Sequence, residues 1–366
     1  MPRRRVTIRP SFPPEPCPTP QFFRGLAAGC HPAGHLSDSS SIVRHSGAKD
    51  RSVSVEGFVT RACQPLREAI PALSFERPVT RRYVHRQAVA EVFLTDCVEL
   101  PEPNGFAVAA QWPRLHGFYR VRDGLYDPML LGETLRQAAI YLAHSRYRVP
   151  LNRRFIMHDL HVRAHLDALK VGAAAADVTA TATLSDLVYG GEALSSFRVD
   201  LRFWLAGREI GSAAGVAAAL PPSTYTRARW GTAGPRTPGP ARCGAATPPA
   251  AVGHVDDQHV VLGRQAAPGE WELRVDVTHP VLFDHPLDHL PGMLLLEALR
   301  QSAFAALQVP DAHLESIDAV FHRFAELDQR ATVRVRALDA DPLSVRAVIR
   351  QAGVDVTSGC VRLGRR

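Results

Sequence analysis

The sequence predicts an α+β protein built from two fused copies of one unit, in which an antiparallel sheet wraps around a central helix. The first observation is a repeat: residues 129–139 return as residues 293–303, and eight of the eleven positions are identical. The second is that both copies are apolar on nearly every side, as an enclosed helix must be. The third is that strand-like segments surround each helix in the same order. This is the hot-dog arrangement, and two copies in one chain predict an internal pseudo-dimer.

The first unit is expected to span residues 81–222. Its strand-like segments alternate Val, Thr, Phe and Leu with small or polar residues, which is the period-two pattern of a half-buried antiparallel sheet. The expected elements are strands at 90–96 and 106–112, a helix at 128–145, and strands at 155–166, 175–188, 193–205 and 208–220. Two consecutive prolines, Pro221 and Pro222, end this unit.

A second unit with the same order of elements is expected over residues 253–366. Residues 223–252 separate the two units and are rich in Pro, Gly, Thr and Ala, which predicts a linker. The expected elements are strands at 258–263 and 270–278, a helix at 292–308, and strands at 315–328, 330–339, 343–351 and 353–362.

Residues 1–80 are rich in Pro, Ser, Arg and Gly and lack sustained periodicity. They are expected to be a disordered extension, or to result from a start codon assigned too far upstream, with order beginning near Tyr83. They also carry most of the net charge of +7, with 11 basic against 6 acidic residues. The remaining 286 residues have 32 basic against 30 acidic residues, so the folded part is not expected to attract a nucleic acid.

Several protein classes are excluded by what the chain lacks. Its apolar runs are far too short to span a bilayer. Its six cysteines form no Cys-x-x-Cys pair, which predicts reduced thiols in a cytoplasmic protein without disulfides or a metal site. No phosphate-binding loop, dinucleotide fingerprint or Gly-x-Ser-x-Gly motif is present, so the corresponding nucleotide-binding and hydrolase classes are excluded.

Polar residues interrupt both apolar helices and cluster just before them. In the second copy the helix starts at Pro291-Gly292-Met293, where unpaired backbone N–H groups and the helix dipole are suited to stabilise an oxyanion. The further candidates of this copy are His279, His285, Asp288, His289, Glu297, Arg300 and Gln301; the first copy offers His116, Asp127, Glu133, Arg136 and Gln137. The second copy has the fuller set and is expected to be the working half.

Glu297 has two interpretations. Desolvation inside an enclosed helix predicts a raised pKa and a role as general base or acid. Alternatively, Glu297 forms a buried ion pair or hydrogen-bonded group with Arg300 or Gln301 that only satisfies buried charges.

The histidines of the approaching segment also allow more than one role. His285 and His289 are four residues apart, which raises a metal site, but Pro286 and Pro291 oppose a regular helix face there. Since no third ligand has suitable spacing, no metal is expected. The two histidines are expected either to transfer protons, positioned by a neighbouring Asp, or to shape the loop through hydrogen bonds.

The second helix and its approach closely resemble the A-factor synthase (AfsA) family of actinobacteria. The resemblance covers roughly residues 83–366 and rests mainly on residues 271–293 and 297–301, with first-half support from residues 84–86, 90–96, 111–113 and 126–128. It implies two fused hot-dog units similar to 3-hydroxyacyl-carrier-protein dehydratases. The dehydratase likeness is partial, because Phe283 stands where strict counting places their catalytic histidine.

The resemblance also implies a reaction. Members of the family condense a 3-oxoacyl thioester with dihydroxyacetone phosphate, the committed step towards γ-butyrolactone signalling molecules. The expected partners are therefore a 3-oxoacyl carrier protein or acyl-CoA and dihydroxyacetone phosphate, with no cofactor, no metal and no membrane. A hot-dog thioesterase or dehydratase, and a non-catalytic regulator of the same signalling pathway, are the alternatives.

Roles for the candidate residues follow from this implied acyltransferase. The thioester carbonyl is expected to face the N–H groups of Gly292 and Met293. Glu297, or His285 through water, is expected to take the hydroxyl proton, and an arginine to bind the phosphate. The catalytic candidates are Glu297, His285, Asp288, His289, Glu133 and His116; the substrate-binding candidates are Gly292, Met293, Arg136, Arg300, Gln137, Gln301, His279 and Asp127.

Overall fold

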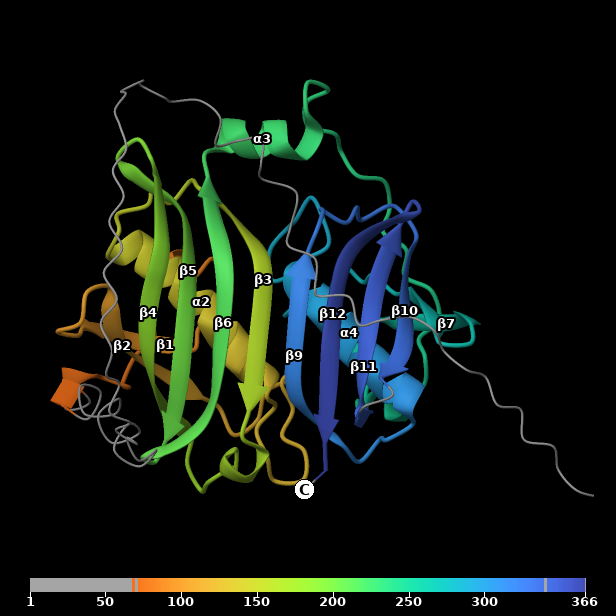
Figure 1. The fold of residues 1–366 in the computed structure, drawn as a ribbon, viewed down its shortest axis with the longest axis horizontal. Helices are drawn as coiled ribbons and strands as arrows, with labels where there is room; N and C mark the ends of the chain where they lie inside the picture. The colour runs from red at the N-terminus through yellow and green to blue at the C-terminus, as the bar shows by residue number, and fades with distance from the viewer. Residues whose placement is uncertain (1–67, 70–71, 339–340, 366) are drawn as a thin grey trace, which may run out of the picture. The chain divides into compact units, whose positions relative to one another are not determined.

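The computed structural model describes residues 68–69, 72–338 and 341–365, and its centre is a sheet of twelve strands with two long helices behind it (Figure 1). The strand order is β1-β2-β4-β5-β6-β3-β9-β12-β11-β10-β8-β7. Six strands come from each half of the chain, and every neighbouring pair is antiparallel.

The first half places one long helix between its second and third strands. Its elements are β1 (Leu94–Glu99), β2 (Gly105–Trp112), α2 (Met129–Ser145), β3 (Arg154–Ala164), β4 (Ala176–Gly190), β5 (Ala193–Leu205) and β6 (Arg208–Leu220). The second half repeats this order with β7 (Leu262–Ala267), β8 (Glu270–Leu273), α4 (Gly292–Leu307), β9 (His313–Phe321), β10 (Ala331–Leu338), β11 (Asp341–Gln351) and β12 (Val354–Gly364). The prediction of two fused hot-dog units is confirmed.

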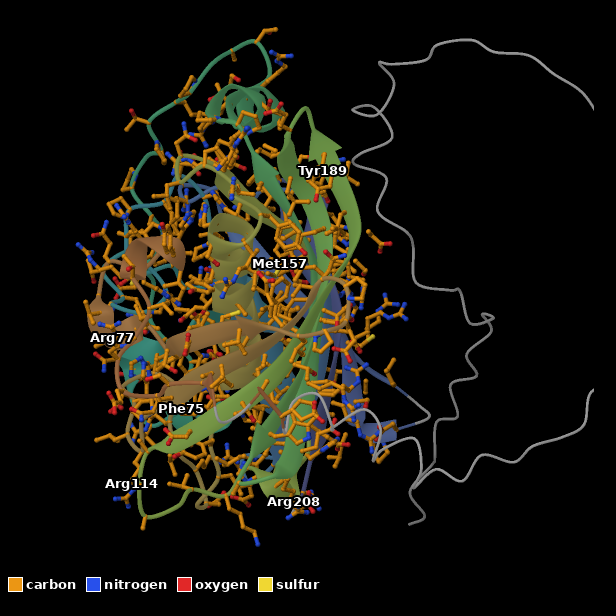
Figure 2. The ribbon with its side chains drawn as sticks, turned by 90° about the vertical axis from the view of Figure 1, so that its left-hand side faces the viewer. Phe75, Arg77, Arg114, Met157, Tyr189 and Arg208 are labelled. Atoms are coloured by element: carbon orange, nitrogen blue, oxygen red, sulfur yellow. The ribbon has the colours of Figure 1, made fainter. Side chains whose placement is uncertain are left out.

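Each long helix packs against the strands of its own half. α2 contacts β1, β2, β3, β5 and β6, and α4 contacts β7 and β9 to β12. In a side view the long strands form one layer, with Tyr189 and Arg208 near their opposite ends and Arg77 on the side away from them (Figure 2). Because the sheet encloses the helices, Glu133 on α2 and Glu297 on α4 are both buried, and each carboxylate needs partners within the protein.

The two halves join where β3 pairs with β9, so the sheet continues from one half to the other without a free edge (Figure 1). Charged side chains cross this seam on the sheet. His161 Nδ1 lies 2.8 Å from a carboxylate oxygen of Asp318, and Arg163 donates to the same carboxylate at 2.7 Å. The expected internal pseudo-dimer is therefore one continuous sheet, which removes the exposed strand edge that each half would have alone.

Several expected elements differ from those observed. The segment expected as a strand at 90–96 starts with a 3₁₀ helix (Val89–Glu91), and β1 begins only at Leu94. The strands expected at 270–278 and 315–328 end at Leu273 and Phe321. In both cases the remaining residues form loops whose polar groups bind neighbouring loops and strands: Arg274 donates to the carbonyl of Val260, and the N–H of Glu326 donates to Gln351. Their composition continues that of the strand, but they are not part of any ladder of the described sheet.

A helix, α3 (Pro222–Trp230), lies within the Pro- and Gly-rich segment expected as a linker. Pro222 occupies its first turn, where a proline costs no hydrogen bond. Tyr225 is buried and Arg229 binds Glu326 of the second half, so α3 is attached to that half through its side chains.

The expected disorder of residues 1–80 lies almost entirely outside the described residues, apart from 68–69 and 72–80. Within the described part of the chain, none of the helices combines the length and the apolar character needed to cross a bilayer.

Candidate active site

Glu133 is completely buried on α2 and lies at the centre of a cationic group. Arg136 donates to both of its carboxylate oxygens, at 2.9 and 3.0 Å. Arg86 approaches within 2.7 Å, and Gln137 donates at 2.7 Å. Burial alone would raise the pKa of Glu133, but the charges of Arg136 and Arg86 outweigh it and lower the pKa to about 2.

Glu297 on α4 has equivalent partners, except that a histidine stands in place of one arginine. Arg300 lies 2.8 Å from its Oε2, Gln301 donates to Oε1 at 2.7 Å, and His254 Nε2 lies 2.8 Å from Oε1. His254 therefore takes the place that Arg86 has in the first half.

The expected raised pKa of Glu297 is wrong. Burial does act to raise it, but Arg300 and His254 hold the pKa well below its ordinary range. The carboxylate is charged and paired with Arg300, as the ion-pair interpretation requires. The reason is that Arg300, one turn further along the helix, contacts the Glu297 carboxylate, and its positive charge favours the ionised form. The hydrogen bonds of the carboxylate, from Gln301 and Arg300 and with His254, all go to Oε1.

Gln137 and Gln301 connect the helices to the segments that precede them. The side-chain oxygen of Gln137 accepts the N–H of Phe93, and its amide donates to the carbonyl of Glu91. Gln301 forms the equivalent pair of bonds with Val261 and His259. Both glutamines thus satisfy buried backbone groups, and neither faces an open space suited to a substrate.

The N-terminus of α2 is closed. Asp127 accepts the N–H of Met129 at 2.9 Å, and Arg300 from the other half donates to both of its carboxylate oxygens at 2.8 Å. Asp127 and Arg300 are both buried. Arg300 is thereby shared between two carboxylates, Asp127 and Glu297, which occupy both of its terminal nitrogens.

The N-terminus of α4 differs because Pro291 occupies the position of Asp127. Within the described part of the chain, no side chain caps this end of α4, and Pro291 and Gly292 are partly exposed. The N–H groups of Gly292 and Met293 belong to its first turn, which has no intrahelical acceptors. The two halves thus have one closed and one open helix start.

The loop before α4 is attached to the first half rather than to its own helix. Asp284 accepts two backbone N–H groups, from Gln87 at 2.6 Å and from Ala88 at 3.0 Å. The neighbouring side chain, His285, is one-third exposed. Burial lowers the pKa of His285, Asp284 opposes this, and the positive charges of Arg136 and Arg86 lower it further.

This arrangement brings together some of the expected site residues and separates others. Arg136 and His285 lie close enough together for the charge of Arg136 to lower the pKa of His285. Arg136 is the counterpart of Arg300, which contacts the start of α2, so from the equivalence of the halves we infer that Arg136 faces the first turn of α4, with Gly292 and Met293. We call this place between the halves the junction site. Glu297 lies instead with His254 and influences His279. The residues of the second copy therefore do not form one site among themselves.

His116 and His279 are equivalent residues that shape their loops. Nδ1 of His116 accepts the N–H groups of Phe118 and Tyr119, at 3.1 and 3.0 Å. Nδ1 of His279 accepts those of the second and third residues after it, at 3.2 and 3.0 Å. Since each lone pair is engaged with the backbone, neither ring is available as a base.

Asp288 and His289 lie beside α3. Asp288 accepts the hydroxyl of Tyr225 at 2.8 Å and contacts His289 Nδ1, and Arg229 donates to the Asp288 carbonyl. The ring of His289 packs edge-on against Phe324. These contacts attach α3 to the loop, so we reassign both residues to positioning.

The family model of the A-factor biosynthesis hotdog domain matches residues 69–221 and 237–358. This chain belongs to the AfsA family. An AfsA-family relative from Streptomyces virginiae, named 2-oxo-3-(phosphooxy)propyl 3-oxoalkanoate synthase, is 38% identical over 262 residues, which cover 72% of this chain and 88% of the relative. A protein of the same name from Streptomyces griseus subsp. griseus is 34% identical over 310 residues, covering 80% of this chain and 94% of the relative.

Solved structures also align with this AfsA-family chain. An acyl-ACP thioesterase from Bacteroides thetaiotaomicron aligns at 11% identity with a TM-score of 0.45, covering 70% of this chain and 98% of that one. A dehydratase domain of the Curacin polyketide synthase aligns at 12% identity with a TM-score of 0.42, covering 75% and 97%. Likenesses of this size say nothing about the reaction.

The sequence did not single out three residues of the buried groups: Arg86, His254, and His144 on α2, whose Nδ1 lies 2.7 Å from the carbonyl oxygen of Val149. Asp284 was expected only as the neighbour that positions His285. Arg86 belongs to the segment 84–86 that carries part of the AfsA resemblance, and this was its one signal. Its partner Glu133 is 47 residues away, and no local pattern connects the two.

Proposed function

We propose that this chain is an acyltransferase that joins a 3-oxoacyl thioester to dihydroxyacetone phosphate, the reaction that its relatives' names describe. The observation that supports it best is the difference between the two helix starts. Asp127 and Arg300 close the start of α2, whereas the start of α4 has no side-chain cap among the described residues, and Arg136 is the counterpart of Arg300 that we infer to face it. The proposed site therefore combines residues of both halves, in place of the expected working second half.

The proposed roles follow from the groups around the junction site. The N–H groups of Gly292 and Met293 bind the thioester carbonyl oxygen and stabilise the charge that develops on it during attack. Arg136 pairs with the phosphate, because a guanidinium can bind two phosphate oxygens at once. The Arg136 side chain is 18% exposed. The position equivalent to Asp127 is Pro291, so no carboxylate there competes with the phosphate for Arg136.

His285 exchanges protons with the substrates in this proposal. Its Nδ1 faces Asp284 at 3.5 Å, so a positive charge on the ring has a carboxylate beside it. Glu133 and Glu297 act by holding Arg136 and Arg300 in place. They are positioning residues, and Glu297 is not the proton acceptor.

The source of the acyl group is a carrier protein or coenzyme A, both of which present a thioester. The proposal also puts the protein in the cytoplasm, where such thioesters are made. The described cysteines Cys97, Cys243 and Cys360 are free thiols, which agrees with a reducing compartment.

The proposal is tested by incubating the protein with a 3-oxoacyl thioester, with and without dihydroxyacetone phosphate, and measuring thiol release and the ester product. Release that requires the phosphate compound supports the transferase. Equal release without it indicates a thioesterase and refutes the proposal.

A pair of variants tests the phosphate role. Arg136→Gln should raise KM for dihydroxyacetone phosphate by about tenfold or more, since a charge-assisted contact contributes about 1.5–3 kcal/mol. The matched control is Arg336→Gln, an exposed arginine on β10, which should leave KM unchanged.

A further inference from the structure

His85 lies between the two halves, in the short segment that joins them at the junction site. The next residue, Arg86, contacts Glu133 on α2 and donates to the carbonyl of Val281 in the loop before α4. The two residues after it donate their N–H groups to Asp284. The segment that carries His85 is therefore bound both to α2 and to the loop before α4. His285 of that loop is near enough to affect the pKa of His85.

The backbone of His85 has a left-handed conformation, with φ of 51°. Histidine adopts this conformation more often than most residues, and here it follows the 3₁₀ turn Arg81–Tyr83, where the N–H of Arg86 donates to the carbonyl of Arg81 at 3.1 Å. The ring of His85 contacts His144 on α2.

The hydrogen bonds of His144 define which nitrogen of each ring carries a proton. His144 Nδ1 lies 2.7 Å from the carbonyl oxygen of Val149, which can only accept, so Nδ1 carries the proton. Burial lowers the pKa of His144, so its Nε2 is an acceptor. His85 Nε2 lies 3.0 Å from that atom and must donate to it. Neutral His85 is left with an unprotonated Nδ1.

Aromatic contacts keep both rings in place. Phe155 packs edge-on against His85 and His144, with centroid distances of 5.3 and 5.2 Å, and Tyr83 stacks on His144 at 6.1 Å. His85 resembles an oriented catalytic base. Its Nε2 is held by His144, and within the described part of the chain its Nδ1 has no hydrogen-bond partner.

We propose that His85, oriented by His144, accepts the proton of the hydroxyl group that attacks the thioester. This assignment rests on the proposed function. The hydroxyl proton moves to His85 Nδ1 while its oxygen forms the new ester bond, and the carbon–sulfur bond breaks. The departing thiolate then takes the proton that His85 has accepted, which restores the neutral ring.

The charges around His85 connect its basicity to binding of the acceptor. Burial, His144, Arg136, His285 and Arg154 together lower the pKa of His85 to about 3. The ring is then neutral at physiological pH but weakly basic. A bound phosphate offsets the charges of Arg136 and Arg154, so the basicity of His85 rises as dihydroxyacetone phosphate binds.

Replacing His85 with Asn tests the role without disturbing the backbone, because Asn tolerates positive φ better than most residues. We expect kcat for the transfer to fall about 10²–10⁴-fold, with KM for the thioester and the melting temperature unchanged. The matched control is His165→Asn, an exposed histidine after β3, which should keep the parent rates.

Two variants of His144 separate positioning from packing. His144→Leu removes the acceptor for His85 and should lower kcat. His144→Gln carries one donor and one acceptor on its side-chain amide, so it should restore most of the rate. If Leu and Gln variants have the same rate, His144 does not act by orienting His85.

Nitrogen-15 NMR of histidine-labelled protein reads the tautomer directly. We expect His85 to carry its proton on Nε2, and added inorganic phosphate to raise its pKa. A proton on Nδ1, or a fully active His85→Asn variant, overturns the assignment alone. A parent protein without release that depends on dihydroxyacetone phosphate overturns the proposed function as well.

Discussion

The buried carboxylates give a prediction about stability that separates the two interpretations of Glu297. Holding the pKa of Glu133 at about 2 instead of its ordinary 4.5 corresponds to about 3 kcal/mol of folding free energy at neutral pH. Because the folded-state pKa is depressed, this contribution is present above about pH 4.5 and is lost as the pH falls towards 2. Removing one partner of a buried ion pair costs about 3–5 kcal/mol.

Glu133→Gln should be the more damaging substitution. It leaves Arg86 and Arg136 together without a carboxylate, so its cost should approach about 5 kcal/mol. Glu297→Gln should cost about 3 kcal/mol, because Arg300 keeps its pairing with Asp127. Each kilocalorie lowers the melting temperature of a domain of this size by about 2 °C.

The assay is urea unfolding at pH 7, with thermal melting as a second measure. The control is Glu192→Gln at the exposed turn between β4 and β5, which should change stability by less than about 0.5 kcal/mol. If both buried variants melt like the parent, the ion pairs do not stabilise the fold. If Glu297→Gln abolishes turnover with unchanged melting, Glu297 is a proton acceptor after all and our reassignment is wrong.

Three further predictions concern the surroundings of the junction site. Asp127→Asn should lower the melting temperature, because Arg300 loses one of its two carboxylates, yet keep most of the kcat; a large loss of kcat would mean that the closed helix start is catalytic. Asp284→Ala should lower kcat by releasing the loop from two backbone N–H groups, and unchanged kinetics would show that the loop needs no such anchor. Gly359→Ala places a Cβ 2.5 Å from the carbonyl oxygen of Asp318, so urea unfolding should show a loss of about 1–3 kcal/mol; an equally stable variant would mean that β9 and β12 can separate locally.

The expected elements matched the structure where a repeated pattern spans many residues. The repeat at 129–139 and 293–303 located both helices because each copy is apolar over several consecutive turns, and nearly all of these residues are buried. Short segments were less predictable. Residues 90–93 have the composition of a strand but lie outside β1, and a 3₁₀ helix ends at Glu91. Gln137 on α2 binds the carbonyl of Glu91 and the N–H of Phe93 in place of a neighbouring strand.

The candidate site was predicted as a set of residues, but not as an arrangement. The sequence pointed to Arg136, His285 and the Pro291-Gly292 helix start, and the fold brings Arg136 and His285, from different halves, near each other. It also pointed to Glu297 as a base, and the structure reverses the predicted direction of its pKa. Of the partners that decide this, Arg300 was one of the two alternatives that the sequence left open. His254 is 43 residues from Glu297, and no local pattern connects the two.

The sequence by itself determined the duplicated hot-dog fold and the AfsA family, because the periodicity of apolar residues and the repetition of a motif can be read directly from the order of residues. Only the tertiary structure decided which half supplies which group. The start of α2 is closed by an arginine from the other half, and the loop carrying His285 faces α2. Such contacts depend on how the two halves pair through β3 and β9, and on charges meeting across a buried interface where no water can replace a missing partner.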